Sequence, residues 1–181
     1  MGMTSLAYYL HEAGMVVEAF DDHFTEPCRT RMEEMGIQIH SDSTTNAKPD
    51  YVVRSSAVPE SSDEVRSWVN KGIPVYRRGD FLSRLLSEKK VLAVVGSHGK
   101  TSTTGMLAWA FKQVGFPCSH LIGGRFFQDQ YNPGQYVRSP WVLIEVDESD
   151  GSIDGFSPEI TLALNCDWDH VDQYQDCLLY T

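Results

Sequence analysis

Apolar positions recur along the chain with two periods, one typical of α-helices and one typical of β-strands. The helical period predicts helices over residues 4–13, 26–35, 61–70, 81–86 and 100–114. Short apolar runs predict strands over residues 15–20, 37–39, 51–54, 73–76, 91–95, 141–146 and 160–165. The runs 15–20, 141–146 and 160–165 are expected to be buried, and residues 116–140 to form loops with room for a short strand. Because helices alternate with strands, we expect parallel sheets with helices on both faces.

Two units are expected along the chain. The basic pair Lys89-Lys90 marks a boundary, so the first unit covers residues 1–88 and the second covers residues 89–181. The first unit shows the βαβ rhythm of a Rossmann-like α/β domain, and its third helix is expected to begin at a capping box that starts with Ser61.

Composition narrows the class of protein. The chain has 181 residues, of which 41% are hydrophobic and 22% charged, values typical of a soluble globular protein. The formal net charge of −10 argues against nucleic-acid and anionic-membrane partners. We find no signal peptide and no apolar run of the roughly 20 residues that a membrane span needs. Four cysteines without paired spacing favour free thiols, and a cytoplasmic location is expected.

The strongest chemical signal lies between the strand 91–95 and the helix that follows it. There the sequence Gly96-Ser97-His98-Gly99-Lys100-Thr101 combines a glycine turn with a Lys-Thr pair at the start of a helix. Backbone N–H groups at such a turn attract an anion, Lys100 can reach the β- and γ-phosphates of a nucleotide, and Thr101 can bind Mg²⁺. The full phosphate-loop pattern has a glycine where this chain has Val94, so the loop is a shortened version. The motif predicts phosphate binding.

Two acidic segments follow predicted strands in the second unit. They are Glu145–Asp150 and Asn165–Asp172, and in the second His170 stands among carboxylates. Ligands of an open α/β sheet bind at the carboxyl ends of its strands, so the glycine loop and both acidic segments should converge on one site. Carboxylates and a histidine there can hold Mg²⁺. A solvated acidic surface is the alternative for the acids.

Together these residues resemble the central ATPase domain of the Mur ligases. The resemblance rests on the glycine loop at Gly96, the E-x-D-E-S-D stretch from Glu145 and the N-x-x-x-D-H-x-D segment from Asn165. Three segments of the first unit are similar to further landmarks of that family: Gly2–Ala7, Ser55–Val58 and Ile73–Arg78. The resemblance covers nearly the whole chain. It implies a Rossmann-like parallel-sheet domain followed by a truncated phosphate-loop ATPase domain.

The resemblance also implies the site residues. In the first unit, the UDP of UDP-N-acetylmuramate would be bound by Asp21 (or its neighbour Asp22), Ser55 and Ser56. In the second unit, ATP would be bound by Gly96, Ser97, His98, Gly99, Lys100, Thr101 and Ser102. One Mg²⁺ ion would be held by Thr101 and Glu145 and a second by His170, and the catalytic residues would be Lys100, Asn165 and His170.

The activity that the resemblance implies is an ATP-dependent ligase of peptidoglycan precursor synthesis, and hence a role in cell wall biogenesis, cell shape and cell division. Such an enzyme joins L-alanine to the carboxylate of UDP-N-acetylmuramate through an acyl phosphate, with ATP and Mg²⁺ as cofactors. Two alternatives stay open: a member of the family that adds a whole tripeptide, and a non-catalytic nucleotide-binding module. An NAD-dependent enzyme is disfavoured because the chain has no G-x-G-x-x-G sequence.

The ends of the chain depart from the family pattern. The sequence starts inside the first glycine loop and stops soon after His170, so we expect a fragment without the opening strand and the third domain. Residues 177–181 do not continue the pattern and are expected to be non-native. We therefore expect the 181-residue chain alone to lack ligase activity.

Overall fold

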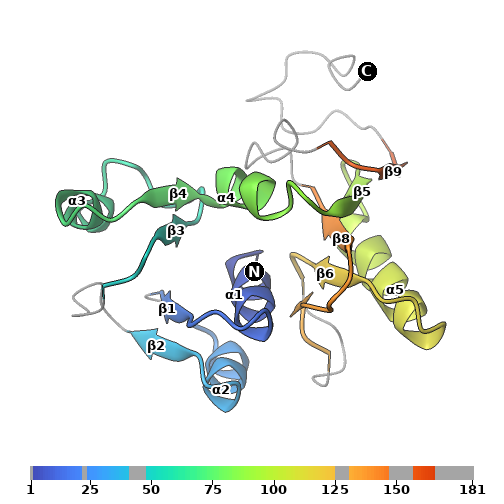
Figure 1. Ribbon diagram of the computed structural model, residues 1–181, viewed down its shortest axis with the longest axis horizontal. Helices are drawn as coiled ribbons and strands as arrows, with labels where there is room; N and C mark the ends of the chain where they lie inside the picture. The colour runs from blue at the N-terminus through green and yellow to red at the C-terminus, as the bar shows by residue number, and fades with distance from the viewer. Residues whose placement is uncertain (1, 22–23, 41–47, 125–130, 147–156, 166–181) are drawn as a thin grey trace.

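The computed structural model describes residues 2–21, 24–40, 48–124, 131–146 and 157–165. Figure 1 shows short strands and helices of the first half on the left and a larger sheet with one long helix on the right. Within these ranges no helix is both long and apolar enough to cross a lipid bilayer.

Helices and strands alternate through the first half, as the apolar pattern predicts. In chain order the described elements are α1 (Gly2–Glu12), β1 (Glu18–Phe20), α2 (Glu26–Glu34), β2 (Gln38–His40), β3 (Val52–Arg54), α3 (Asp63–Asn70), β4 (Val75–Arg77) and α4 (Arg78–Leu85). The cap of α3 is Ser62 and not the predicted Ser61. The Ser62 hydroxyl accepts a hydrogen bond from the N–H of Val65 at 3.3 Å, and Val65 is the third residue of the helix, where a cap can reach.

The second half builds one sheet around a single long helix. Its elements are β5 (Lys90–Val95), α5 (Lys100–Gln113), β6 (Ser119–Leu121), β7 (Gly134–Gln135), β8 (Trp141–Glu145) and β9 (Ile160–Ala163). The strand order is β7-β6-β8-β5-β9, and every pair is parallel except β6 with β7. Val94 lies opposite Glu145 and Val95 opposite Ala163, so β5, β8 and β9 end at nearly the same level.

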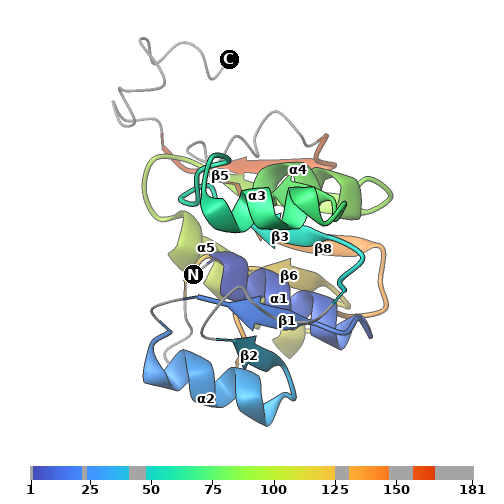
Figure 2. The ribbon, with the colours of Figure 1, turned by 90° about the vertical axis from the view of Figure 1, so that its left-hand side faces the viewer.

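The first half contributes two small parallel pairs, β1 with β2 and β3 with β4. Figures 1 and 2 both show α1 between the β1–β2 pair and β6 of the larger sheet. Helix α1 packs closely on β7, because a Cβ atom at Gly134 would overlap the backbone of Ser5. Helix α1 is therefore shared by the two halves.

Side chains of β5 and β8 alternate between two hydrophobic clusters, one on each face of the larger sheet. Val91 and Ile144 face a cluster that includes Leu6 of α1 and Leu82 of α4, whereas Leu143 faces α5. The first cluster thus joins residues on both sides of the predicted boundary at residues 88 and 89. The division into units stays a prediction, but hydrophobic packing is continuous across it.

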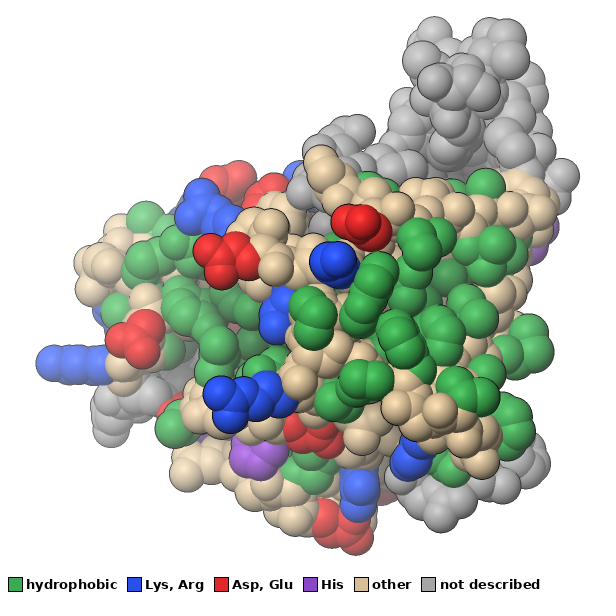
Figure 3. Space-filling model, turned by 45° about the vertical axis from the view of Figure 1, so that its right-hand side comes forward, with side chains coloured by type: hydrophobic (Ala, Val, Ile, Leu, Met, Phe, Trp, Pro, Cys, Tyr) green, Lys and Arg blue, Asp and Glu red, His purple; other side chains and the backbone are tan. Residues whose placement is uncertain are grey.

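Two strands that we expected to be buried are largely exposed. In β1 only Ala19 is partly covered, and Val16 just before it is 96% exposed. All four residues of β9 are exposed, because β9 is the edge strand of the described sheet. The prediction of burial was wrong for both, whereas β8 is buried as predicted. Figure 3 shows hydrophobic side chains gathered on the face that carries α5. The large exposed hydrophobic residues in α5 and just after it are Met106, Trp109, Val114 and Phe116.

Candidate functional site

The loop between β5 and α5 requires glycine at two positions. Gly96 has φ +140°, and a Cβ atom there would lie 3.1 Å from the carbonyl oxygen of Asn165. Gly99 has φ +83° and is the N-cap of α5. Both backbone conformations are strained for residues with a side chain. The two glycines therefore let the chain turn tightly from the end of β5 into the first turn of α5.

Asn165, which follows β9, holds this loop from the side. Its Oδ1 accepts a hydrogen bond from the N–H of His98 at 2.8 Å, and its Nδ2 donates to the carbonyl of the same residue at 2.9 Å. The N–H of Ser97 also donates to the backbone oxygen of Asn165 at 3.4 Å. The predicted convergence of the glycine loop with the segment after β9 is thus present in the described residues.

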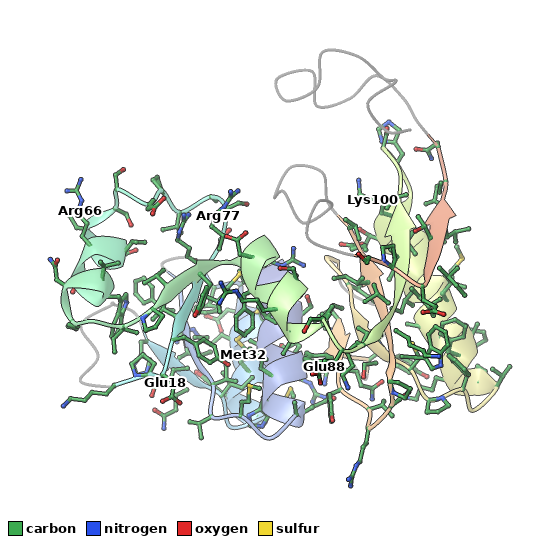
Figure 4. The ribbon with its side chains drawn as sticks, turned by 45° about the horizontal axis from the view of Figure 1, so that its top comes forward. Glu18, Met32, Arg66, Arg77, Glu88 and Lys100 are labelled. Carbon is green, nitrogen blue, oxygen red and sulfur yellow. The ribbon has the colours of Figure 1, made fainter. Side chains whose placement is uncertain are left out.

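Lys100 is the first residue of α5, and its side chain points back over the loop. Its Nζ donates a hydrogen bond to the carbonyl of Gly96 at 2.7 Å, and its own carbonyl accepts one from the Thr104 hydroxyl at 2.8 Å. Figure 4 shows Lys100 in the half of the molecule that holds the larger sheet, whereas Arg66 and Arg77 belong to the other half. A lysine placed over a helix N-terminus supplies positive charge where an anion would meet backbone N–H groups.

Glu145, the last residue of β8, stands beside this loop. Burial raises the pKa of its carboxyl above the usual value, and the Thr101 hydroxyl, the backbone of Gly123 and the charges of Arg78 and Lys100 oppose that rise. Its Oε2 is buried and has no hydrogen-bond partner among the described residues. An ionised carboxylate with a bare buried oxygen is costly unless a cation compensates it. The chemistry of this pair, Thr101 with Glu145, fits a hard cation such as Mg²⁺.

The structure adds residues that the sequence reasoning did not assign to the site. Arg78, at the start of α4, has a buried Nε, and its guanidinium lies against Gly2, where a Cβ atom would be 2.9 Å from Arg78 Cζ. A Cβ atom at Gly123 would overlap Glu145, and one at Gly124 would overlap the side chain of Thr101. In the sequence, the pair Gly123-Gly124 after β6 could have indicated the close approach of this turn to Thr101. The arginine pair at the end of β4 was noted as a family landmark, but only the fold brings Arg78 near Glu145.

The remaining predicted residues fall into two groups. Asp21 follows β1 and is exposed, and Ser55 and Ser56 follow β3, where the Ser55 hydroxyl accepts a hydrogen bond from the N–H of Ala57 at 3.3 Å. These residues stand at the carboxyl ends of strands, as the predicted UDP site requires, but on sheets separate from that of the glycine loop. His170, the acids of residues 147–150 and 166–172 and the segment 177–181 lie outside the described residues. Within the described residues no three His, Cys, Asp or Glu side chains are grouped so that they could hold a metal ion.

Known proteins share both the sequence and the fold of this chain. The Mur ligase family, catalytic domain, matches residues 1–90. A UDP-N-acetylmuramate–L-alanine ligase from Syntrophomonas wolfei is 36% identical over 177 residues, a match that covers 96% of this chain and 38% of that protein. This chain belongs to the Mur ligase family. It spans little more than a third of the length of that curated relative.

Solved Mur ligase structures share the fold as well. UDP-N-acetylmuramate-alanine ligase from Thermotoga maritima superposes with a TM-score of 0.84 at 27% identity, covering 98% of this chain and 42% of that one. The ligase of UDP-N-acetylmuramate and L-alanyl-gamma-D-glutamyl-meso-diaminopimelate from Neisseria meningitides gives 0.82 at 29% identity, covering 98% and 61%. The predicted α/β fold class is confirmed. A ligase that adds alanine and a ligase that adds a peptide therefore both share the fold of this chain.

Proposed function

We propose that this chain carries the nucleotide-binding and phosphoryl-transfer parts of an ATP-dependent ligase that joins L-alanine to the carboxylate of UDP-N-acetylmuramate in peptidoglycan precursor synthesis. One observation carries the proposal: the glycine loop, Lys100 and the half-buried carboxylate of Glu145 meet at the carboxyl ends of the parallel strands β5 and β8. The name of the Syntrophomonas wolfei relative supports the choice of substrates. A cytoplasmic location belongs to the same proposal.

The residues present fit ATP with Mg²⁺. The two loop glycines let the chain turn tightly into the N-terminus of α5, where backbone N–H groups attract an anion. The bare oxygen of Glu145 is the kind of ligand that Mg²⁺ takes. Bound together, ATP and Mg²⁺ would supply the γ-phosphoryl group. The muramoyl carboxylate would accept it with release of ADP, and the amine of L-alanine would then displace phosphate from the acyl phosphate. In the proposal, Thr101 and Glu145 hold the ion, and His170 holds a second one.

The chain's own residues act by position and charge. Lys100 offsets the repulsion between the triphosphate and the incoming carboxylate, both of which are anionic. The backbone of residues 96–102 orients the phosphates at the N-terminus of α5. Asp21, Ser55 and Ser56 are proposed to hold the uridine diphosphate of the other substrate.

Two other functions stay as candidates, each with its own discriminating test. The Neisseria meningitides structure favours a ligase that adds a peptide, and supplying either L-alanine or the tripeptide as acceptor distinguishes it. A nucleotide-binding module without turnover would bind Mg-ATP but would not need to bind a UDP-sugar. Titration with UDP-N-acetylmuramate separates that module from a ligase, because a ligase must bind the sugar nucleotide.

The activity of the 181-residue chain alone is the subject of a separate prediction. Because the chain spans 38% of the Syntrophomonas wolfei relative, we expect no ATP-dependent ligation of L-alanine by it alone. A coupled assay for released phosphate checks this. Alanine-dependent release by the unextended chain would contradict the expectation.

A further inference from the structure

Asn165 contacts three successive residues of the loop that enters the phosphate site. Its side-chain amide makes two hydrogen bonds to His98, its carbonyl accepts one from Ser97, and its backbone closes the space beside Gly96. The N–H of Leu164 continues the β5–β9 ladder by donating to the carbonyl of Val95 at 3.0 Å. The hydrogen bonds between Asn165 and the loop therefore follow directly after those that pair β5 with β9.

Only a short primary amide fits both partners at His98. A backbone N–H and C=O of one residue need an acceptor and a donor side by side, and the amide of asparagine offers both in one plane. An aspartate would keep the acceptor but would set an oxygen against the His98 carbonyl. An alanine would remove both hydrogen bonds and leave the two backbone groups of His98, which is exposed, to water.

We propose that Asn165 is a positioning residue for the phosphate loop, acting on bound nucleotide through the backbone of His98 and not by touching the nucleotide. The inference rests on the proposed function only in that the loop binds ATP. Because Asn165 takes the N–H groups of Ser97 and His98, the backbone donors for phosphate are the other N–H groups of the 96–102 segment. This assignment replaces the direct catalytic role that the family resemblance implied for Asn165.

The first test measures the loop without any nucleotide. We expect Asn165→Ala and Asn165→Asp to speed backbone hydrogen exchange of the 96–101 segment by about tenfold, since a hydrogen bond to a backbone group is lost in each. The matched control is Asn132→Ala, because Asn132 also bonds across elements, accepting from Arg31 Nε at 3.0 Å, but lies far along the chain from the loop. A residue that acts only by touching ATP would leave this exchange unchanged, and that result would overturn the proposal.

The second test adds Mg-ATP to the same proteins. In both Asn165 variants we expect affinity for Mg-ATP to fall by about tenfold while affinity for UDP-N-acetylmuramate stays unchanged. Faster exchange with unchanged Mg-ATP affinity would overturn the positioning role. If Asn165→Ala does not fold, Asn165→Asp, which has the same shape, decides the matter. A wild-type chain that binds no Mg-ATP would overturn the proposed function itself, whereas wild-type exchange rates in the variants would overturn only the role of Asn165.

Discussion

Glu145 is a residue whose burial costs stability. One oxygen of its half-buried carboxyl is buried and bare, and burial raises the carboxyl pKa, so ionising it costs free energy unless a cation compensates the charge. The sequence placed this glutamate at a strand end, and a resemblance assigned it to Mg²⁺. The resemblance also paired Thr101 with Glu145, but the sequence could not show that Gly123 and Arg78 lie beside it, because these two residues come from separate parts of the chain.

Replacing Glu145 with glutamine should therefore separate binding from stability. Glutamine has the same shape without the charge, so we expect Mg²⁺-dependent nucleotide binding to weaken at least tenfold, while the melting temperature of the nucleotide-free chain does not fall. Calorimetric titration and thermal unfolding check the two parts. Unchanged Mg²⁺ dependence in the variant would remove Glu145 from the site.

At the scale of elements, periodicity located the helices and strands but not their surroundings. The apolar run of β9 suggested a buried strand, yet its place at the edge of the described sheet leaves Ile160 53% exposed and Leu162 41% exposed. Strand order depends on which distant segments pair, and periodicity within a segment carries no such information. The loop geometry was more predictable, because Gly96 and Gly99 are required by local backbone angles that the motif itself implies.

The contact between β6 and the segment before β7 predicts a pH dependence of stability. The imidazole of His120 is buried and lies 2.9 Å from the carbonyl of Asn132, and burial lowers its pKa below the usual value. The unfolded chain then binds more protons than the folded one at mildly acidic pH, so this contribution to stability is present above the unfolded-state pKa and is lost as pH falls toward the folded-state value.

We expect the free energy of unfolding to decrease as pH falls below roughly 6.5, the ordinary histidine value. The variant His120→Gln, which can still donate to the Asn132 carbonyl, should lose part of this decrease. Urea unfolding at several pH values measures it. A slope in the variant equal to that of the wild type would show that other groups cause the decrease.

At the scale of the whole molecule, the core does not follow the boundary that the sequence suggests. The basic pair Lys89-Lys90 separates two recognisable motif sets, but Leu82 of α4 is fully buried in the same cluster as Val91 and Ile144. Figure 4 shows Glu88 where the two halves meet. A charge pair in the sequence marks a change of motif, whereas packing across that point depends on contacts between residues far apart in the chain.

This shared core predicts cooperative unfolding. We expect Leu82→Ala to reduce the free energy of unfolding by about 2–5 kcal/mol and to speed hydrogen exchange in β5 and β8 as well as in α4. Exchange measured segment by segment in low urea checks both. Destabilisation confined to residues before 88 would show that the two halves unfold independently.

The most direct test of the proposed ligase is phosphate release by the chain extended at both ends with the corresponding segments of the Syntrophomonas wolfei relative. The matched variants are Lys100→Ala and Lys112→Ala, which remove one lysine from the first and the last turn of the same helix, α5. We expect release to require ATP, UDP-N-acetylmuramate and L-alanine together, to be lost in Lys100→Ala and to persist in Lys112→Ala. Release that survives Lys100→Ala, or that proceeds without UDP-N-acetylmuramate, would contradict the account.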